Sequence, residues 1–172
     1  TLTRRATAYR QAGQFHKALD DAENALGLTD GQGGYEDRAA RAEALRVKGQ
    51  ALFRLDQPEQ AQGCLETALG LYSDLDQKAN IPIVEMELGV LCRGRGDLTA
   101  ALQHYQLARA AWERSGNLGW KSTLLNNMGV VYHQAGRFAE AFQAFEDALN
   151  AAEESGFTRT QALTYNSLGD LL

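Results

Sequence analysis

Residues 125–149 read LNNMGVVYHQAGRFAEAFQAFEDAL, and the small residues in this stretch stand at regular distances. After Gly129 come Gly136, Ala141 and Ala148, at offsets of 7, 12 and 19 residues. Large apolar residues stand between them, at Val130, Val131, Tyr132, Phe138, Phe142 and Phe145. The pattern is typical of two antiparallel helices joined by a tight turn, because small residues let two helix backbones approach closely and large ones fill the space beside them.

The same pattern recurs along the chain. The glycine returns every 40 residues, at Gly49, Gly89, Gly129 and Gly169. Its companions return with it at the turn and on the second helix: Asp56, Gly96 and Gly136; Ala61, Ala101 and Ala141; Ala68, Ala108 and Ala148. A first unit has Ala6 in place of the glycine, followed by Gly13, Ala18 and Ala25. A fixed period of this length predicts a solenoid of stacked helix pairs, whose extended surface usually binds other molecules.

The expected helices follow from this repeat and from the apolar spacing. They cover residues 3–12, 15–27, 37–55, 58–74, 80–94, 97–114, 120–135, 138–154 and 159–172. The connector Thr29-Asp30-Gly31-Gln32-Gly33-Gly34 absorbs the extra residues between the first two units and is predicted to be flexible. The expected core comprises Tyr9, Leu52, Leu65, Leu88, Cys92, Leu102, Tyr105, Met128, Tyr132, Phe138, Phe145 and Leu168.

These residues and offsets resemble the tetratricopeptide repeat (TPR) family. The period is longer than the family's usual one of about 34 residues, and in this it is similar to kinesin light chains and to the TPR arrays of MalT-like activators and other bacterial signal-transduction ATPases. Arg114-Ser115-Gly116-Asn117 and Glu154-Ser155-Gly156-Phe157 resemble the bacterial group most. The resemblance implies an all-α fold, a right-handed superhelical solenoid of stacked helix hairpins.

Composition limits the possible functions. The 172 residues are 44% hydrophobic with only 2 prolines, which suits helix throughout. No long apolar run or signal peptide is present, so neither a membrane span nor secretion is expected. Two cysteines, Cys64 and Cys92, make no disulfide framework, and they favour a reducing, cytoplasmic setting. A formal net charge of −5 argues against direct nucleic-acid binding.

The expected organisation is one TPR array over residues 1–172, with about four repeats and the first helix of a fifth. We expect this array to be a fragment of a longer protein, because the last unit lacks its second helix and neither end carries a polar cap. The apolar face of that last helix, with Leu163, Leu168, Leu171 and Leu172, would then be uncovered. The chain is therefore expected to self-associate or fray there.

No motif points to catalysis, a cofactor or a metal. His16, His104 and His133 lie in different units without ligand spacing. Residues 31–34, GQGG, follow a helix and lack the Lys-Ser/Thr ending of a phosphate-binding loop. The tripeptide Arg95-Gly96-Asp97 fits a helix-pair turn with Asp97 as the helix cap. Trp112 and Trp120 are interpreted as packing residues rather than ligand platforms.

The candidate binding surface is the concave face of the array. In the TPR family this face is formed by the first helix of each pair, where residues one turn apart share a stripe. On that stripe we predict a peptide-binding groove made of Arg10, Arg46, Gln50, Phe53, Arg54, Met86, Val90, Arg93, Asn126, Val130, His133, Gln134 and Asn166. Thr3, Thr7, Glu43, Ile83 and Asp170 lie on the same stripe.

The chemistry of this stripe suggests its partner. The stripe carries four arginines and only two acidic residues, Glu43 and Asp170, so its charge is positive within an acidic chain. It would attract an anionic or extended polar partner. The amides of Asn126 and Asn166 suit the backbone of a bound peptide, as the resemblance to kinesin light chains also implies. An apolar stretch with Met86, Val90 and Val130 either anchors a side chain of the partner or is covered by an adjacent segment.

The sequence thus predicts a non-enzymatic module that binds a protein or an extended, acidic peptide in its groove. It would be the sensor or scaffold part of a larger bacterial regulator, in signalling or transcription. Two alternatives stay open: a small-molecule inducer-sensing arm of a MalT-like activator, and a purely structural or oligomerisation segment. Sugar sensing would need aromatic platforms in the groove, where Phe53 alone is aromatic.

Overall fold

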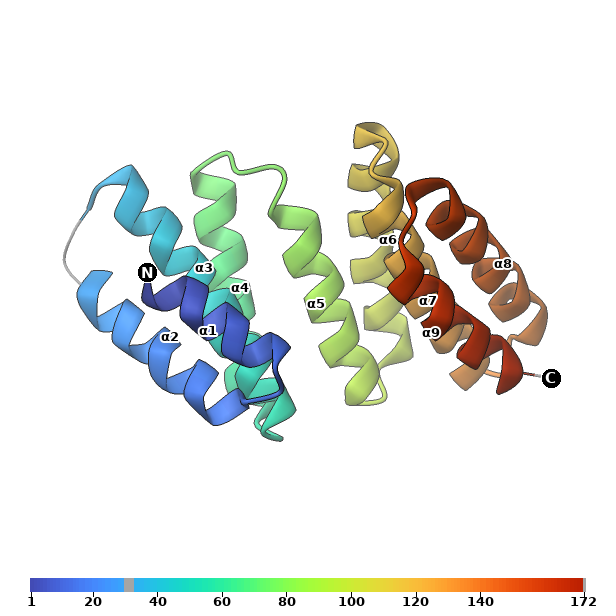
Figure 1. The fold of residues 1–172 in the computed structure, drawn as a ribbon, viewed down its shortest axis with the longest axis horizontal. Helices are drawn as coiled ribbons and strands as arrows, with labels where there is room; N and C mark the ends of the chain where they lie inside the picture. Colours follow the sequence, from blue (N-terminus) through green and yellow to red (C-terminus); the bar gives the residue numbers. More distant parts are fainter. Residues whose placement is uncertain (30–32, 172) are drawn as a thin grey trace. The chain divides into compact units, whose positions relative to one another are not determined.

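The computed structural model describes residues 1–29 and 33–171, and over these residues the chain is all-helical (Figure 1). Its helices are α1 (Leu2–Gln11), α2 (Phe15–Thr29), α3 (Tyr35–Arg54), α4 (Pro58–Asp74), α5 (Ile81–Gly94), α6 (Leu98–Ser115), α7 (Leu118–Gln134), α8 (Phe138–Ser155) and α9 (Thr158–Gly169). The predicted helices are confirmed to within a few residues at each end. The last one ends at Gly169, before the expected residue 172. The expectations for Asp30, Gly31, Gln32 and Leu172 lie outside the described residues.

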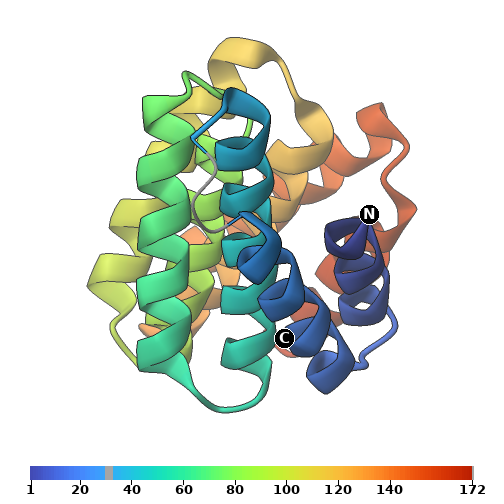
Figure 2. The ribbon, with the colours of Figure 1, turned by 90° about the vertical axis from the view of Figure 1, so that its left-hand side faces the viewer.

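The chain divides into two compact units, and unit 1 comprises residues 1–91. In unit 1, α1 pairs with α2 and α3 with α4, and α2 also packs on α3 (Figure 2). The main core of unit 1 joins α3, α4 and the part of α5 up to Leu91, around Leu52, Leu65, Tyr72 and Leu88. A smaller cluster of Ala6, Ala22 and Val47 connects α1, α2 and α3.

Unit 2 comprises residues 92–172 and contains α6 to α9. Helix α7 is central, because it packs on α6, α8 and α9. Fully buried side chains of unit 2 include Tyr105 on α6, Leu124 and Val131 on α7, and Phe145 on α8. Each pair thus buries one apolar stripe per helix against its neighbours, as the repeat pattern predicts.

The turn within each predicted repeat uses a left-handed backbone conformation. Gly13, Gly96 and Gly136 have φ values of 74°, 82° and 72°, where a side chain is strained. Asp56 takes the same place with φ of 61°, as a non-glycine residue that tolerates this region. The turn positions predicted from the repeat are therefore confirmed.

The recurring glycines mark real points of close approach. A Cβ on Gly49 would lie 2.9 Å from Cγ of Leu65 and 3.0 Å from the carbonyl oxygen of Ala61. A Cβ on Gly129 would lie even closer to the ring of Phe145. At Gly169, in contrast, a Cβ would meet no atom within 4 Å. The small residues therefore have the predicted packing role at positions 49 and 129.

The expected core is largely right, with one error. Leu52, Leu65, Leu88, Tyr105, Met128 and Phe145 are buried, whereas Tyr9, Cys92, Leu102, Tyr132 and Leu168 are half-buried. The prediction of Phe138 as a core residue is wrong, since 59% of its surface is exposed. It is the first residue of α8 and lies beside the ring of His133 at the turn, so helix packing does not cover it.

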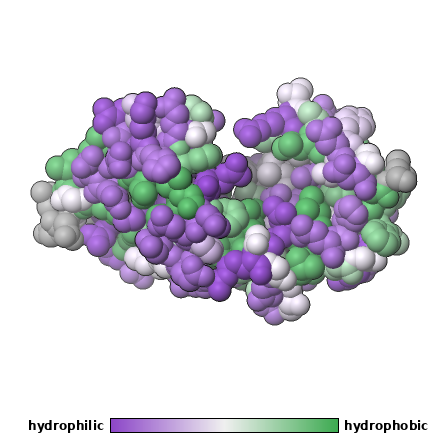
Figure 3. Space-filling model, turned by 90° about the horizontal axis from the view of Figure 1, so that it is seen from below, coloured by the Kyte–Doolittle hydropathy of each residue, from purple (hydrophilic) through white to green (hydrophobic). Residues whose placement is uncertain are grey.

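The surface mixes polar and apolar residues. On the face drawn in Figure 3, hydrophilic residues predominate, with hydrophobic residues in small groups between them. Among the described residues no helix is long and apolar enough to cross a membrane.

Candidate functional site

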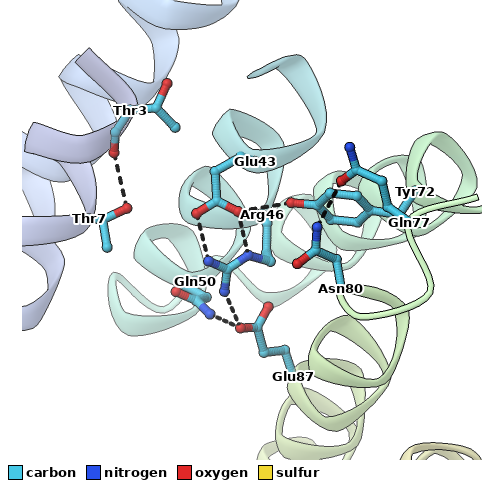
Figure 4. A network of polar contacts seen from close by, with 9 residues as sticks. All are labelled: Thr3, Thr7, Glu43, Arg46, Gln50, Tyr72, Gln77, Asn80 and Glu87. Carbon is cyan, nitrogen blue, oxygen red and sulfur yellow. Dashed lines mark hydrogen bonds and ion pairs between the residues drawn. The ribbon is translucent and has the colours of Figure 1, made fainter. Parts of the chain in front are cut away.

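A network of charged and polar side chains occupies the predicted stripe of unit 1 (Figure 4). Arg46 on α3 donates two hydrogen bonds to Glu43, at 2.9 Å from Nε to Oε2 and 2.7 Å from Nη2 to Oε1. Its Nη1 donates to Oε1 of Glu87 on α5 at 2.6 Å. Tyr72 on α4 donates its hydroxyl to Glu43 Oε2 at 2.8 Å, and Gln50 donates its amide to Glu87. The network therefore joins α3, α4 and α5.

Most of this network is withdrawn from water. The side chains of Arg46 and Glu87 are 14% and 12% exposed. Burial raises the pKa of Glu87 to about 7, although the positive charges of Arg46 and Arg10 oppose this shift. Burial likewise opposes ionisation of Glu43, but hydrogen bonds from Arg46 and Tyr72 hold the pKa of this carboxyl below its usual value. The two carboxyls differ because Glu87 is more deeply buried, 12% exposed against 34% for Glu43, and because Glu43 receives more hydrogen bonds.

Two buried acceptors of the network have no hydrogen-bond partner among the described residues. They are Oε1 of Gln50 and Oε2 of Glu87. A buried acceptor without a donor is costly, so Oε1 of Gln50, and Oε2 of Glu87 when this carboxyl is ionised, favour a group that brings an N–H or O–H to them.

A hollow of about 250 Å³ lies beside the network, between α1 and α3. It is lined by Thr1, Thr3, Arg4, Thr7, Ala40 and Glu43. Thr3, Thr7 and Glu43 belong to the predicted stripe, and Glu43 also belongs to the network. The hydroxyl of Thr7 donates to the carbonyl oxygen of Thr3 at 3.0 Å (Figure 4).

A spacing of 41 residues links two of the predicted groove residues to the next repeat. Arg46 contacts Glu87, and Asn126 Oδ1 accepts a long hydrogen bond of 3.5 Å from Ser167. Both pairs join the same position of one repeat to the following position of the next. These two side chains therefore help to hold successive first helices together in addition to any role in binding.

The other predicted residues of unit 1 lie in different surroundings. The positive charge of Arg10 lowers the pKa of both Glu43 and Glu87. Phe53 packs against the core of unit 1, Met86 is buried and Val90 is half-buried. The guanidinium of Arg54 lies over the ring of Phe15 on α2, at 5.2 Å from its centroid.

The predicted residues of unit 2 are also divided. Burial raises the pKa of Tyr105 on α6 to about 12. The nearby positive charge of Arg93 opposes this shift. His133 packs on Phe138, with 5.8 Å between the ring centroids. Asn126 is buried, Val130 is half-buried, and Gln134 and Asn166 are exposed on α7 and α9.

The charge of the stripe differs from the expected one in unit 1. The expectation treats Arg46 as a free positive charge and omits Glu87. In the structure Glu43 and Glu87 both pair with Arg46, so two carboxylates balance Arg10 and Arg46. Sequence reasoning missed Glu87 because it lies one position after the stripe residue Met86 on its own helix. The sequence does contain a sign of this pair, because Arg46 and Glu87 are 41 residues apart, one more than the repeat period.

Other groups singled out in the sequence have structural roles. Trp112 and Trp120 stack on each other, with 5.5 Å between centroids and 8° between planes, so their interpretation as packing residues is confirmed. Asp97 caps α6 by accepting a hydrogen bond from the Ala100 amide at 2.9 Å. Both cysteines are free thiols. Across residues 1–29 and 33–171, no three metal-ligating side chains come together.

Comparison with known proteins identifies the repeat. Residues 80–154 match the model of the tetratricopeptide repeat family. The protein KINESIN LIGHT CHAIN-RELATED 2 of Arabidopsis thaliana is 29% identical over 142 residues, which are 79% of this chain and 21% of that protein. The chain thus spans about a fifth of the length of this curated relative.

Two solved structures share the fold. Aspartyl phosphate phosphatase F from Bacillus subtilis has a TM-score of 0.83 at 13% identity, over 99% of this chain and 47% of its own. A Rap protein complexed with competence and sporulation factor has a TM-score of 0.81 at 18% identity, over 99% of this chain and 52% of its own. At these identities the match shows the all-α, solenoid-type fold alone. The family match over residues 80–154, the 40-residue glycine spacing and this fold together support a tetratricopeptide repeat solenoid.

Proposed function

We propose that this chain is a protein-interaction module that binds an extended protein or peptide segment along the first helices of its repeats. The observation that carries the proposal is the hollow between α1 and α3, because its lining residues Thr3, Thr7 and Glu43 fall on the stripe predicted from the repeat alone. The module would serve as the sensor or scaffold part of a larger bacterial regulatory protein.

The network beside the hollow favours a partner that supplies hydrogen-bond donors. Gln50 and Glu87 each have a buried acceptor atom that lacks a partner among the described residues. Glu43 lines the hollow. Backbone N–H groups of an extended peptide are donors of this kind. Because Arg46 is paired with carboxylates, it does not attract an acidic partner. We therefore propose that any preference for acidic peptides depends on Arg54 and Arg93.

Support from relatives is of the same kind. The kinesin light chain-related protein is similar in sequence, and the Rap protein complexed with competence and sporulation factor shares the fold. The complex of the Rap protein with competence and sporulation factor supports the proposal that this chain also binds a partner. A second candidate function, small-molecule sensing, is favoured by a different hollow in unit 2, lined by residues of α6, α7 and α8.

A peptide-array screen with the purified chain tests the proposal, followed by fluorescence anisotropy on the best binders. Asn126→Ala is expected to weaken binding by about tenfold with little salt dependence, because it removes a short-range hydrogen-bonding group. Replacing Arg54 and Arg93 together by Gln is expected to weaken binding of acidic peptides in a salt-dependent manner, mainly through the association rate.

Two charge reversals on the second helices serve as controls. Glu66→Lys on α4 and Glu146→Lys on α8 change exposed residues outside the stripe, and both should leave binding unchanged. Binders that ignore every change on the stripe, or that respond equally to these controls, would refute the proposed surface. A chain that binds no peptide would favour a structural role instead.

A further inference from the structure

A second hollow of about 250 Å³ lies inside unit 2, away from the predicted groove, between α6, α7 and α8. Its apolar lining is small and comes from Leu118, which is half-buried, and from the edges of Leu125 and Ala151, which are 3% and 6% exposed. Around this lining stand charged and polar side chains of three helices: Arg109, Lys121, Asp147, Asn150 and Glu154. Known ligand sites combine an apolar lining with a few polar groups in the same way.

The two signs of charge come from different helices. The positive groups are Arg109 of α6 and Lys121 of α7, and the negative groups, Asp147 and Glu154, both belong to α8. Lys121 lies in the first turns of α7, at the positive end of its dipole, whereas Glu154 lies in the last turn of α8, at the negative end. The helix dipoles therefore reinforce the separation of charge across the hollow.

These charges are not used up by pairing across the hollow. Arg109 pairs within its own helix with Glu113, at 2.7 Å. Asp147 accepts a hydrogen bond from Gln143 one turn earlier on α8, at 3.0 Å. Arg109 and Asp147 thus make these contacts along their own helices, which leaves the space between them open to a ligand.

We propose that this hollow binds a small zwitterion with an aliphatic side chain, that is, a free aliphatic amino acid. Its carboxylate would lie at Lys121 and Arg109, and its ammonium group at Asp147, Asn150 and Glu154. Its side chain would cover Leu118, Leu125 and Ala151. The volume is slightly below the roughly 300–1,000 Å³ of drug-sized sites, which fits a ligand of this size rather than a peptide. This proposal does not depend on the peptide-binding groove.

The test uses L-leucine as the probe and the full 172-residue chain. Calorimetry gives the affinity, and amide chemical shifts in nuclear magnetic resonance spectra locate the site. Leucinamide lacks the carboxylate and N-acetyl-leucine lacks the ammonium group, so each is a matched control. We expect leucine to shift amides near residues 109, 118–125 and 147–154, and each control to bind at least about tenfold more weakly.

Variants assign the two ends of the ligand. Lys121→Met should weaken the binding of leucine by about tenfold, so that this variant binds leucine no more tightly than leucinamide. Lys121→Arg should retain most of the affinity for leucine. The double variant Asp147→Asn, Glu154→Gln should weaken the binding of leucine, so that it binds leucine no more tightly than N-acetyl-leucine. Glu146→Gln, on α8 but outside the lining, is the control, and circular dichroism of every variant verifies the fold.

Several results would overturn the proposal. These are no binding of leucine at millimolar concentration, equal binding of leucine and leucinamide, or chemical shifts that cluster elsewhere. Asn126→Ala is expected to leave leucine binding unchanged, so a failure here is distinguishable from a failure of the peptide-binding groove.

Discussion

Gly129 of α7 faces the buried ring of Phe145 on α8 so closely that a Cβ on the glycine would lie 2.5 Å from Cε1 and 2.6 Å from Cδ1. Real Cβ atoms do not approach other atoms to this distance, and the ring cannot retreat because Phe145 is fully buried. The α7–α8 crossing of unit 2 thus requires glycine at position 129.

Gly129→Ala is therefore expected to destabilise unit 2 by about 1–3 kcal/mol, because overpacking outweighs the better helix propensity of alanine. Gly63→Ala is the matched control in α4, where a Cβ meets nothing within 4 Å. That change should stabilise by up to about 1 kcal/mol. Urea denaturation measures both, and equal signs for the two variants would contradict the packing argument.

Phe145 and Phe138 lie on the same helix but differ in burial. Phe145→Ala should cost about 3–5 kcal/mol, since it leaves a cavity in the core. Phe138→Ala should cost less than about 1 kcal/mol, because the ring is largely exposed at the start of α8. A comparable loss in thermal unfolding for the two variants would show that Phe138 is buried after all.

Asp56 bears a backbone strain that glycine would avoid at the same turn position. Its φ is 61°, and the corresponding Gly136 has φ of 72°. Asp56→Gly is expected to stabilise by up to about 1 kcal/mol, and the reverse change, Gly136→Asp, to destabilise by a similar amount. Chemical denaturation of the two variants should give opposite signs. A stabilising Gly136→Asp would refute the argument.

Glu87 gives unit 1 a pH-dependent stability. Burial raises its pKa from the usual 4.5 to about 7, so between these values the folded state holds a proton that the unfolded state lacks. The stabilisation is complete below about pH 4.5 and is lost as the pH rises through about 7, with an upper limit of roughly 3 kcal/mol. Unfolding free energy should therefore increase as the pH falls from 8 to 5.

The variant Glu87→Gln should flatten this pH dependence. Glu43, whose pKa is lowered, acts in a separate window: its stabilisation is present above its usual pKa of 4.5 and is lost in more acidic solution. Glu43→Gln should hence lower stability by a constant amount above about pH 4.5, leave the slope between pH 5 and 8 unchanged, and remove the acid-induced loss below pH 4.5. If the slope between pH 5 and 8 persists in Glu87→Gln, another group is its source.

The sequence by itself determined the helices, their turns and the points where helices cross. The spacing of small residues sufficed for the crossings at Gly49 and Gly129, because it reflects local geometry that each repeat must satisfy on its own, whereas Gly169 lies at no close approach. The same reasoning identified Asp97 as a cap and Asp56 as a turn residue, since caps and turns depend on only a few neighbouring residues.

Tertiary structure alone decided which polar groups meet. Arg46 is neutralised by Glu87 from the next first helix, 41 residues away, and Arg54 turns to Phe15. Phe138 is exposed, although its place in the repeat pattern predicts a core position. Helical periodicity gives the face of a helix on which a residue lies, whereas the partner on that face depends on how neighbouring helices are offset. Ion pairing and burial follow from that offset, and therefore so does the charge that the surface offers to a ligand.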